Sequence, residues 1–448
     1  MCKRTFPRYV AFGPRTLGGI RQLQGLSSEQ RAVLEALCAV LPFRVNSYVV
    51  EELIDWSNIP DDPIFQLTFP QPGMLKTHEL KTMVDLIRNK ASEREIHEAA
   101  SKIWTAMNPH PDGQMELNVP KLDGERLEGV QRKYRETVLL FPSAGQSCHA
   151  YCTYCFRWPQ FVGAEHLRFA CRNVDRLVRF LRIHPEITDV LITGGDPMTM
   201  NANVLRRYLD PLLSSGIESI RNIRIGTKAL SYWPYRFTSD VDADDLMRLF
   251  EGVNSSGRRL ALMAHFSHPR ELSTTAVKDA MNRILSTGSQ IRTQAPLIRR
   301  INDKPELWAE MWRMQVRMGA VPYYTFIERD TGPKRYFEVS IAEALSIYKE
   351  AVSQVSGLGR TVRGPVMSAV PGKVLVDGEA HVDGERVFVL KMIQGRQRDW
   401  VNRVFLAKWD SWSTWLDQLQ PFGGGEEFFF DSQIREMREQ TKYISQYV

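Results

Sequence analysis

From residue 134 to residue 356, short runs of β-branched and aromatic residues alternate with segments whose apolar residues recur at helical spacing. Typical helical faces are Val174–Leu181 and Leu246–Val253. The pattern predicts six strands, at Val138–Phe141, Val190–Thr193, Ile223–Ile225, Leu260–His265, Ile291–Leu297 and Val321–Ile327. Strands that alternate with helices indicate a parallel α/β sheet, open or closed into a partial barrel. In such folds the chemistry lies at the carboxyl ends of the strands.

The two ends of the chain differ from this middle part. Residues 1–125 are predicted to be mostly helical, with one helix starting after Ser27 and another, Glu93–Met107, capped by Ser92. Residues 108–124 contain a cluster of Pro and Gly and are the best linker candidate. Residues 357–448 form a C-terminal segment in which apolar runs flank Asp-Gly pairs at 377–378 and 383–384, a pattern that predicts antiparallel strands joined by turns.

Composition places the chain among ordinary globular proteins. It has 448 residues, 43% hydrophobic and 25% charged, and no run of 18 apolar residues, so we expect no membrane partner. The net charge of +6 does not by itself imply nucleic acid. The basic N-terminus leads into no apolar segment of the kind that directs secretion, so the expected location is the cytoplasm.

Three of the six cysteines, Cys148, Cys152 and Cys155, form a Cys-x₃-Cys-x₂-Cys motif directly after the first predicted strand. A thiol cluster of this kind belongs in a reducing compartment. A structural zinc site would need a fourth ligand, for which only His149 is near. A [4Fe-4S] cluster with three thiolates and one open iron fits the motif better, because thiolates are the standard ligands of such clusters.

The second predicted strand ends in Gly194, Gly195 and Asp196. Two glycines allow a close approach to the backbone, and a carboxylate there can accept hydrogen bonds from an ammonium group. Taken alone, this pattern describes a tight turn equally well. One strand after the cysteines, it favours a binding site.

These two motifs resemble the signature of radical S-adenosylmethionine (SAM) enzymes, with Tyr154 as the aromatic residue before the third cysteine. Further segments resemble the lysine 2,3-aminomutase family, over residues 28–376 and with the motifs in order. These segments are Tyr134–Leu140, Cys155–Arg157, Ile223–Lys228, Met263–Pro269, Leu297–Asp303 and Pro322–Tyr324. The resemblance implies a radical SAM partial (β/α)6 barrel with an N-terminal helical region and a C-terminal β-containing appendage, divided at 1–125, 134–356 and 357–448.

The resemblance also implies the cofactors and the residues that hold them. SAM would bind the open iron and the residues Gly194, Gly195, Asp196 and His265, with Tyr154 nearby. Pyridoxal 5′-phosphate (PLP) would be bound by Lys373 as a Schiff base, with Tyr134 stacked on its ring and Gln294 near it. Thr137 stands where family members have an arginine for the phosphate, and Arg135 is a candidate substitute.

The residues expected to contact the substrate differ most from those of the lysine-specific family members. Arg157 matches an arginine that clamps the substrate α-carboxylate. Of the two aspartates expected against a lysine side chain, the first corresponds to Arg329 and the second to Val366 or Ser368. An arginine would repel lysine and favour a carboxylate. A slip of one residue would instead bring Asp330 to this place.

We therefore expect a radical SAM, PLP-dependent 2,3-aminomutase acting on a free amino acid other than lysine, with an acidic one favoured. A flavodoxin- or ferredoxin-type protein would donate the electron. A homo-oligomer is left open, because the family's C-terminal zinc-binding cysteines have no counterpart after Cys171. The alternatives are a PLP-independent enzyme of the same fold, such as an epimerase, dehydratase or decarboxylase, and an iron–sulfur redox sensor or RNA-binding protein with a basic N-terminal arm.

The cysteine motif makes a first prediction. Replacing Cys148, Cys152 and Cys155 together by Ala should reduce bound iron to background and abolish 5′-deoxyadenosine formation, because the thiolates hold the iron. Iron analysis after anaerobic reconstitution measures this. Replacing Cys2, Cys38 and Cys171 should leave the iron content unchanged, and a full cluster in the triple Ala variant would contradict the assignment.

Overall fold

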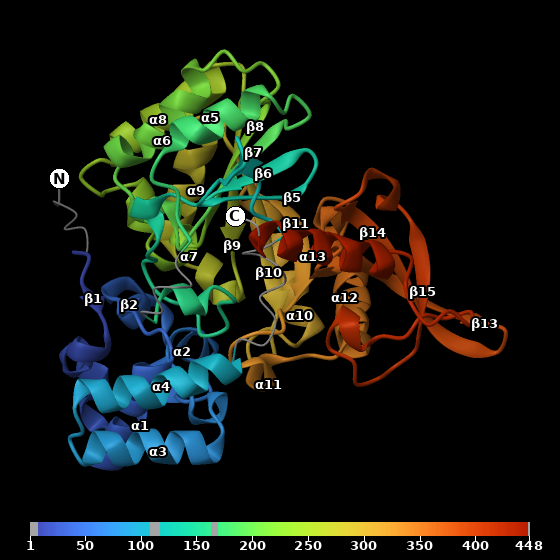
Figure 1. The fold of residues 1–448 in the computed structure, drawn as a ribbon. Coiled ribbons are helices and arrows are strands. Elements are labelled where there is room, and N and C mark those ends of the chain that lie inside the picture. Colours follow the sequence, from blue (N-terminus) through green and yellow to red (C-terminus); the bar gives the residue numbers. More distant parts are fainter. Residues whose placement is uncertain (1–7, 108–116, 163–168, 447–448) are drawn as a thin grey trace.

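Seven parallel strands form the middle of one long sheet in this computed structural model, which describes residues 8–107, 117–162 and 169–446 (Figure 1). Each strand pairs with the next in chain order. The strands are Thr137–Leu140 (β6), Asp189–Ile192 (β7), Asn222–Thr227 (β8), Arg259–His265 (β9), Gln290–Leu297 (β10), Val321–Ile327 (β11) and Arg363–Ser368 (β12). The six predicted strands are thus confirmed, and β12 extends the sheet by one strand that the sequence analysis missed.

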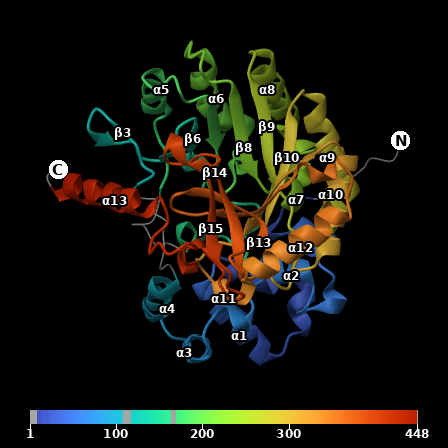
Figure 2. The same cartoon turned by 90° about the vertical axis from the view of Figure 1, so that its right-hand side faces the viewer.

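The helices between these strands lie along the sheet and bury one apolar face against it (Figures 1 and 2). In α8, for example, Leu246, Leu249, Phe250 and Val253 are buried, as the periodicity predicted. The helices are Val174–Arg182 (α5), Ala202–Ser214 (α6), Ala243–Ser255 (α8), Thr275–Ser286 (α9), Pro305–Arg317 (α10) and Ile341–Ser353 (α12). The two helical faces named from the sequence, Val174–Leu181 and Leu246–Val253, thus lie in α5 and α8.

Antiparallel strands flank the parallel ones at both ends of the sheet. They are Val130–Tyr134 (β5) beside β6, and Gly372–Val382 (β13), Glu385–Gly395 (β14) and Val404–Lys408 (β15) beyond β12. The predicted turn at Asp383-Gly384 joins β13 to β14, and both residues have positive φ. The turn predicted at Asp377-Gly378 is wrong, because β13 continues through it with an irregularity in its pairing with β14.

The two ends of the sheet approach each other, so that the C-terminal segment lies near β5. The Lys133 ammonium donates to the carbonyl of Ala369, and the Arg396 guanidinium donates to Asn118 Oδ1 at 2.6 Å. The chain ends in α13 (Asp431–Gln446). This approach brings residues near 134 and 373, which are far apart in the chain, to the same side of the molecule.

The N-terminal region is mostly helical, as predicted. Its helices are Ser28–Val40 (α1), Pro63–Thr68 (α2), Thr77–Arg88 (α3) and Glu93–Met107 (α4), with short strands Ala11–Phe12 (β1) and Val45–Asn46 (β2). Ser27 caps α1 by accepting a hydrogen bond from Gln30 N, and Ser92 accepts one from Glu95 N before α4. Part of the predicted linker, residues 108–116, lies outside the described residues. The proposed boundaries at 125, 134 and 357 stay a prediction.

This region packs against the loops that follow the carboxyl ends of the strands, below the sheet in Figure 1. Its hydrophobic cluster includes Ala150, Trp233, Ile298 and Phe337 from those loops. Two of the contributing segments are short helices, Ala229–Tyr232 (α7) and Lys334–Phe337 (α11). The N-terminal helices therefore cover the side of the sheet where chemistry is expected.

Backbone and side-chain contacts from the N-terminal region hold the cysteine loop, residues 145–157. The buried Asn46 side chain donates to the carbonyls of His149, at 3.1 Å, and Tyr232, at 2.9 Å. Thr153 N donates to the carbonyl of Leu67 at 2.9 Å.

Among the described residues, no helix is both long and apolar enough to cross a membrane.

Asn46→Ala should lower the free energy of unfolding by about 2–4 kcal/mol, because the buried Tyr232 carbonyl loses a donor and Val49 N loses an acceptor, while the His149 carbonyl still accepts from the Tyr9 hydroxyl. It should also increase iron loss on gel filtration, since the cysteine loop loses an anchor. Ser47→Ala is the matched control, because the Ser47 hydroxyl bonds the backbone of Arg8 and not the cysteine loop. Equal iron retention in the Asn46 and Ser47 variants would contradict the anchoring role.

Candidate functional site

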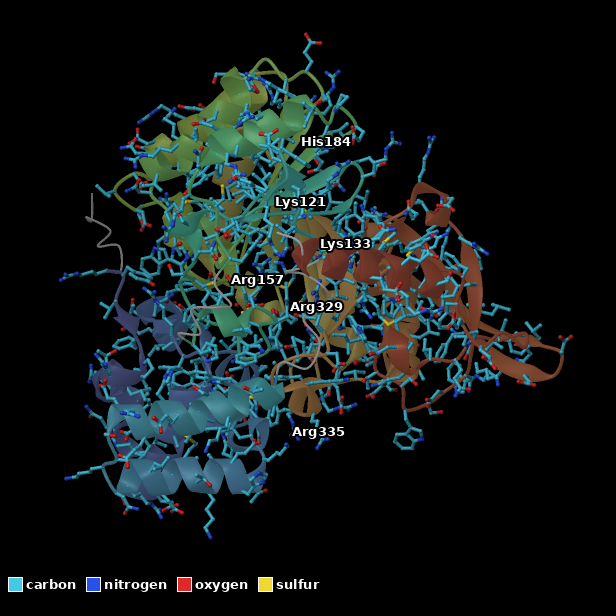
Figure 3. The ribbon with its side chains drawn as sticks, viewed as in Figure 1. Lys121, Lys133, Arg157, His184, Arg329 and Arg335 are labelled. Atoms are coloured by element: carbon cyan, nitrogen blue, oxygen red, sulfur yellow. The ribbon has the colours of Figure 1, made fainter. Side chains whose placement is uncertain are left out.

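A cavity of about 340 Å³ lies at the carboxyl ends of the parallel strands. In Figure 3, Arg157 and Arg329 lie in the middle of the molecule, between the sheet and the N-terminal helices. All thirteen predicted site residues line the cavity: Tyr134, Cys148, Cys152, Tyr154, Cys155, Arg157, Gly194, Gly195, Asp196, His265, Gln294, Arg329 and Lys373. These residues therefore lie around one cavity, while the role of each stays a prediction.

The three motif cysteines lie on the loop after β6 and open into this cavity. Burial raises the pKa of each thiol, to about 12 for Cys155. Within the part of the chain that the structure describes, no three His, Cys, Asp or Glu side chains form a group that could hold a single metal ion. Cys38 and Cys171 are buried free thiols outside the cavity lining, and Cys2 lies outside the described residues.

The Gly194-Gly195-Asp196 turn packs directly on the cysteine loop. A Cβ at Gly195 would lie 2.6 Å from the carbonyl oxygen of Ser147, and Asp196 N donates to that same oxygen at 2.7 Å. The lack of a Cβ at these glycines therefore lets the turn pack against the backbone of the cysteine loop. The turn and the cysteine loop are thus packed and hydrogen-bonded together.

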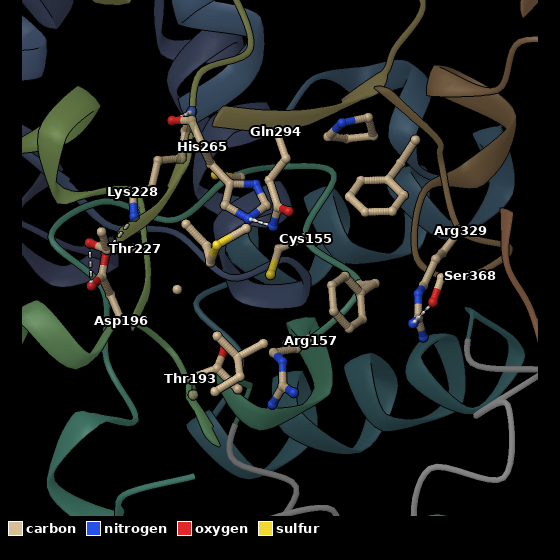
Figure 4. A pocket seen from close by; sticks show the side chains of 18 of the residues that line it. Cys155, Arg157, Thr193, Asp196, Thr227, Lys228, His265, Gln294, Arg329 and Ser368 are labelled. Carbon is tan, nitrogen blue, oxygen red and sulfur yellow. Dashed lines mark hydrogen bonds between the residues drawn. The ribbon is translucent and has the colours of Figure 1, made fainter. Parts of the chain in front are cut away.

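The Asp196 carboxylate is buried and bonded within the protein. Its oxygens accept hydrogen bonds from the Thr227 hydroxyl, at 2.8 and 2.9 Å, and from Lys228 N, at 2.8 Å. Burial raises its pKa to about 6 despite these bonds. The carboxylate is thus held at the cavity wall, in one orientation, where an ammonium group of a ligand would reach it (Figure 4).

His265 and Gln294 lie opposite Asp196 and contact each other (Figure 4). Their Nε2 atoms are 2.8 Å apart. Burial lowers the pKa of His265 to about 3, so its ring is neutral at physiological pH and accepts a hydrogen bond from the Gln294 amide. The predicted SAM-pocket histidine and the predicted PLP-pocket glutamine are therefore linked directly.

Sequence analysis missed a polar network beside the cysteines. Lys228 Nζ lies 2.6 Å from Glu271 Oε1 and 4.6 Å from the ring centre of Tyr232. The Tyr232 hydroxyl lies 3.4 Å from Cys152 Sγ. Lys228 belongs to Ile223–Lys228, one of the segments that resemble the family. Nothing in the sequence indicates that its side chain would contact Glu271 and Tyr232.

Lys373 enters the cavity from β13. Its Nζ donates to Gln394 Oε1 at 2.7 Å and lies 5.5 Å from the ring centre of Tyr134 and 4.7 Å from that of Tyr324. Burial, together with the nearby charges of Arg224 and Arg363, lowers the pKa of Lys373 to about 7. A large fraction of this amine is thus uncharged at neutral pH, which is the reactive form toward an aldehyde.

The wall near Lys373 also offers cationic groups suited to a phosphate. Thr137 lines the cavity at the position where the resemblance led us to look for an arginine, and Lys133 and Arg224 line it as well. Arg135 is exposed and is not among the lining residues. The suggestion that Arg135 replaces the missing arginine is therefore wrong, because its side chain lies in the turn between β5 and β6, outside the cavity.

Two arginines occupy the remaining wall (Figures 3 and 4). The guanidinium carbons of Arg157 and Arg329 lie 5.5 and 4.4 Å from the ring centre of Phe156. Arg329 also donates to Ser368 Oγ at 3.3 Å. Burial, with Arg329 as a further contribution, lowers the pKa of Arg157 to about 10. Arg157 therefore remains a cation at physiological pH.

Three other residues were considered for the contact to the far end of the substrate: Asp330, Val366 and Ser368. Asp330 does not line the cavity, and its carboxylate is 2.7 Å from Lys334 Nζ. Val366 is buried outside the lining, whereas Ser368 is part of it. The alignment slip that would have made Asp330 the contact is therefore not supported by the structure.

Glu328 was also missed. It lines the cavity beside Arg329, and neither of its carboxyl oxygens has a hydrogen-bond partner among the described residues. Burial raises its pKa well above the ordinary range, which favours the neutral acid. A single glutamate after a strand carries no sequence signal of such burial.

Fold and cavity together define an α/β protein whose candidate site, at the carboxyl ends of parallel strands, combines three thiols with a lysine of lowered pKa. Comparison with known proteins identifies the family. No protein-family model matches the chain. It is 30% identical, over 80% of its length and 84% of the relative's, to a provisionally named L-lysine 2,3-aminomutase of Aquifex aeolicus (strain VF5).

Two further relatives match about half of the chain. The L-lysine 2,3-aminomutase of Escherichia coli (strain K12) is 28% identical over 51% of this chain and 63% of its own. The glutamate 2,3-aminomutase of Clostridioides difficile (strain 630) is 24% identical over 51% of each. A crystal structure of Streptococcus suis SuiB aligns with a TM-score of 0.33 and 12% identity, over 63% of this chain and 61% of that one, too distant to support an argument.

The chain belongs to the lysine 2,3-aminomutase family, as a divergent member. It is therefore an enzyme of the radical SAM isomerase class. The second alternative, a redox sensor or RNA-binding protein, is thereby set aside.

The lowered pKa of Lys373 makes a prediction for stability. In protein without PLP, Lys373→Met should raise the free energy of unfolding at pH 6 by as much as about 4 kcal/mol, because folding no longer buries a charged amine. The gain should be full below pH 7, where Lys373 is charged in both states, and should shrink as the pH rises toward 10.5. Denaturant unfolding at pH 6 and pH 9.5 measures this. A gain that does not depend on pH would contradict the assigned pKa.

Proposed function

We propose that the protein is a radical SAM, PLP-dependent 2,3-aminomutase that moves the α-amino group of a free acidic amino acid to its β-carbon. The observation that carries this proposal is one cavity that contains both the three-cysteine motif and a buried lysine whose pKa is about 7. A PLP-independent radical SAM enzyme has no evident use for such a lysine.

The residues present fit all three cofactors. Cys148, Cys152 and Cys155 would hold the cluster, and Asp196 with His265 would face SAM. Lys373 would bind PLP, Tyr134 would contact its ring, and Lys133 and Arg224 offer positive charge for its phosphate. When bound, the cluster and SAM supply a 5′-deoxyadenosyl radical for hydrogen abstraction, and PLP carries the migrating nitrogen.

The chain's own residues orient the substrate and shield it. Arg157 would bind the α-carboxylate, and Arg329 would bind a second carboxylate across Phe156. The N-terminal helices cover the strand ends, which keeps water from the reacting atoms. A Gln394 side chain that accepts from Lys373 keeps the lysine pointing to Tyr134. The electron would come from a flavodoxin- or ferredoxin-type donor.

An acidic substrate is supported by the charge of the wall. Lining cations include Lys133, Arg157, Arg224, Lys228 and Arg329, of which Lys228 is paired with Glu271 and Arg224 with Asp189. The lining carboxyl groups are Asp196, which is bonded to Thr227, and Glu328, whose raised pKa favours the neutral form. A substrate ammonium at the distal end would meet Arg329 and be repelled. One relative is named glutamate 2,3-aminomutase, and this name supports an acidic substrate.

The test uses anaerobically reconstituted enzyme with SAM, PLP and a chemical reductant, and measures 5′-deoxyadenosine and amino acid products. Glutamate or aspartate should trigger deoxyadenosine formation and yield a β-amino acid, and lysine should not. Arg329→Asp should lower kcat/KM for the acidic substrate at least tenfold, which corresponds to ~1.4 kcal/mol.

Arg335→Asp is the matched control, because it makes the same charge change on α11 at an exposed position. It should keep the activity of the unaltered enzyme. The acidic substrate would be contradicted if lysine triggered more deoxyadenosine formation than glutamate or aspartate and if Arg329→Asp did not change the activity. Activity in enzyme free of PLP would contradict the aminomutase itself and favour the PLP-independent alternative.

A further inference from the structure

The Tyr232 side chain contacts a predicted cluster ligand. Its hydroxyl lies 3.4 Å from Cys152 Sγ, and the residue is only 1% exposed. We propose that Tyr232 donates a hydrogen bond to the cluster through Cys152 and thereby raises the reduction potential of the cluster. The inference rests on the proposed function only in requiring that a cluster binds; PLP and the substrate play no part in it.

The direction of the hydrogen bond follows from the chemistry of the partners. Between a free thiol and a phenol, either atom can donate. A cysteine bound to iron is a thiolate, which has no proton and can only accept. The phenol, whose ordinary pKa of about 10 keeps it protonated at neutral pH, must then be the donor.

Two further contacts hold the tyrosine in this position. Asn46 Nδ2 donates to its backbone carbonyl at 2.9 Å, and Lys228 Nζ lies 4.6 Å from its ring centre. Lys228 is itself fixed by Glu271 at 2.6 Å, a carboxylate with 0% exposure. A cation over the ring face draws electron density from the phenol and makes its hydroxyl a stronger donor.

The expected consequence is electrostatic. Reduction adds an electron to the cluster, so a hydrogen bond to a ligand sulfur stabilises the reduced state more than the oxidised state and raises the potential. Tyr232 would make the cluster easier to reduce by its protein donor. It acts through Cys152 and is therefore a positioning residue, not a catalytic one.

The test compares the reconstituted full-length protein with its Tyr232→Phe variant, without SAM, PLP or substrate. The reduced cluster is followed by electron paramagnetic resonance during a potentiometric titration. At a fixed potential, the ratio of reduced to oxidised cluster should be at least threefold lower in Tyr232→Phe. For one electron this is a shift of about 28 mV to lower potential, since 59 mV is tenfold.

Tyr208→Phe is the matched control. Tyr208 lies on α6 with its hydroxyl 3.2 Å from Ser143 Oγ; it is 8% exposed and does not line the cavity. Its removal should leave the potential unchanged. An equal potential in Tyr232→Phe and the unaltered protein would overturn the inference and leave the proposed function standing. Failure of the unaltered protein to bind iron would instead overturn the proposed function.

A second measurement applies if Tyr232→Phe assembles no cluster. The Tyr154 hydroxyl lies near the same cysteine and 3.1 Å from Ser267 Oγ. The measurement therefore uses Tyr154→Phe in D₂O, so that this hydroxyl cannot supply the deuteron that is detected. Electron–nuclear double resonance should then still detect an exchangeable deuteron coupled to the reduced cluster. Absence of that deuteron would overturn the inference.

Discussion

The docking of the cysteine loop between two parts of the chain is the contact on which the site depends. On one side, the Gly195 backbone packs so closely on Ser147 that a Cβ would not fit. On the other, Asn46 and Leu67 of the N-terminal region bind the loop through its backbone. Because both contacts involve backbone atoms, they set the position of the loop without using the thiols, which stay available to the cavity.

The charge of the cavity follows from this enclosed position. Burial disfavours charged groups, and the pKa values of Lys373, His265 and Glu328 all shift toward the neutral form. Burial lowers the pKa of Arg157 only to about 10, so this guanidinium stays charged at physiological pH. Cationic side chains in the cavity wall favour anionic ligands, and the phosphate of the proposed PLP and the carboxylates of the proposed acidic substrate are such groups.

The C-terminal segment completes the site from the far end of the sheet. β13 supplies Lys373, whose Nζ lies 5.5 Å from the ring centre of Tyr134 on β5, at the opposite end of the sheet. Gln394 of β14 and Lys133 of β5 line the same cavity. This meeting requires the two ends of the sheet to approach each other. A substitution that opened the sheet would therefore separate the proposed PLP residues from one another without changing any of them.

The sequence by itself determined the order of the six strands and most of their helices, and it indicated candidate site residues that line one cavity. Strand and helix periodicity are local properties of the backbone, and the cysteine spacing carries its chemistry wherever it folds. Tertiary structure alone decided which side chains meet: Lys373 with Gln394, Lys228 with Glu271, and Tyr232 with Cys152. These pairs depend on strand register and loop docking, which no local pattern encodes. The same reason explains why Asp377-Gly378 continues a strand and why Glu328 is buried: both are settled by neighbours that are distant in sequence.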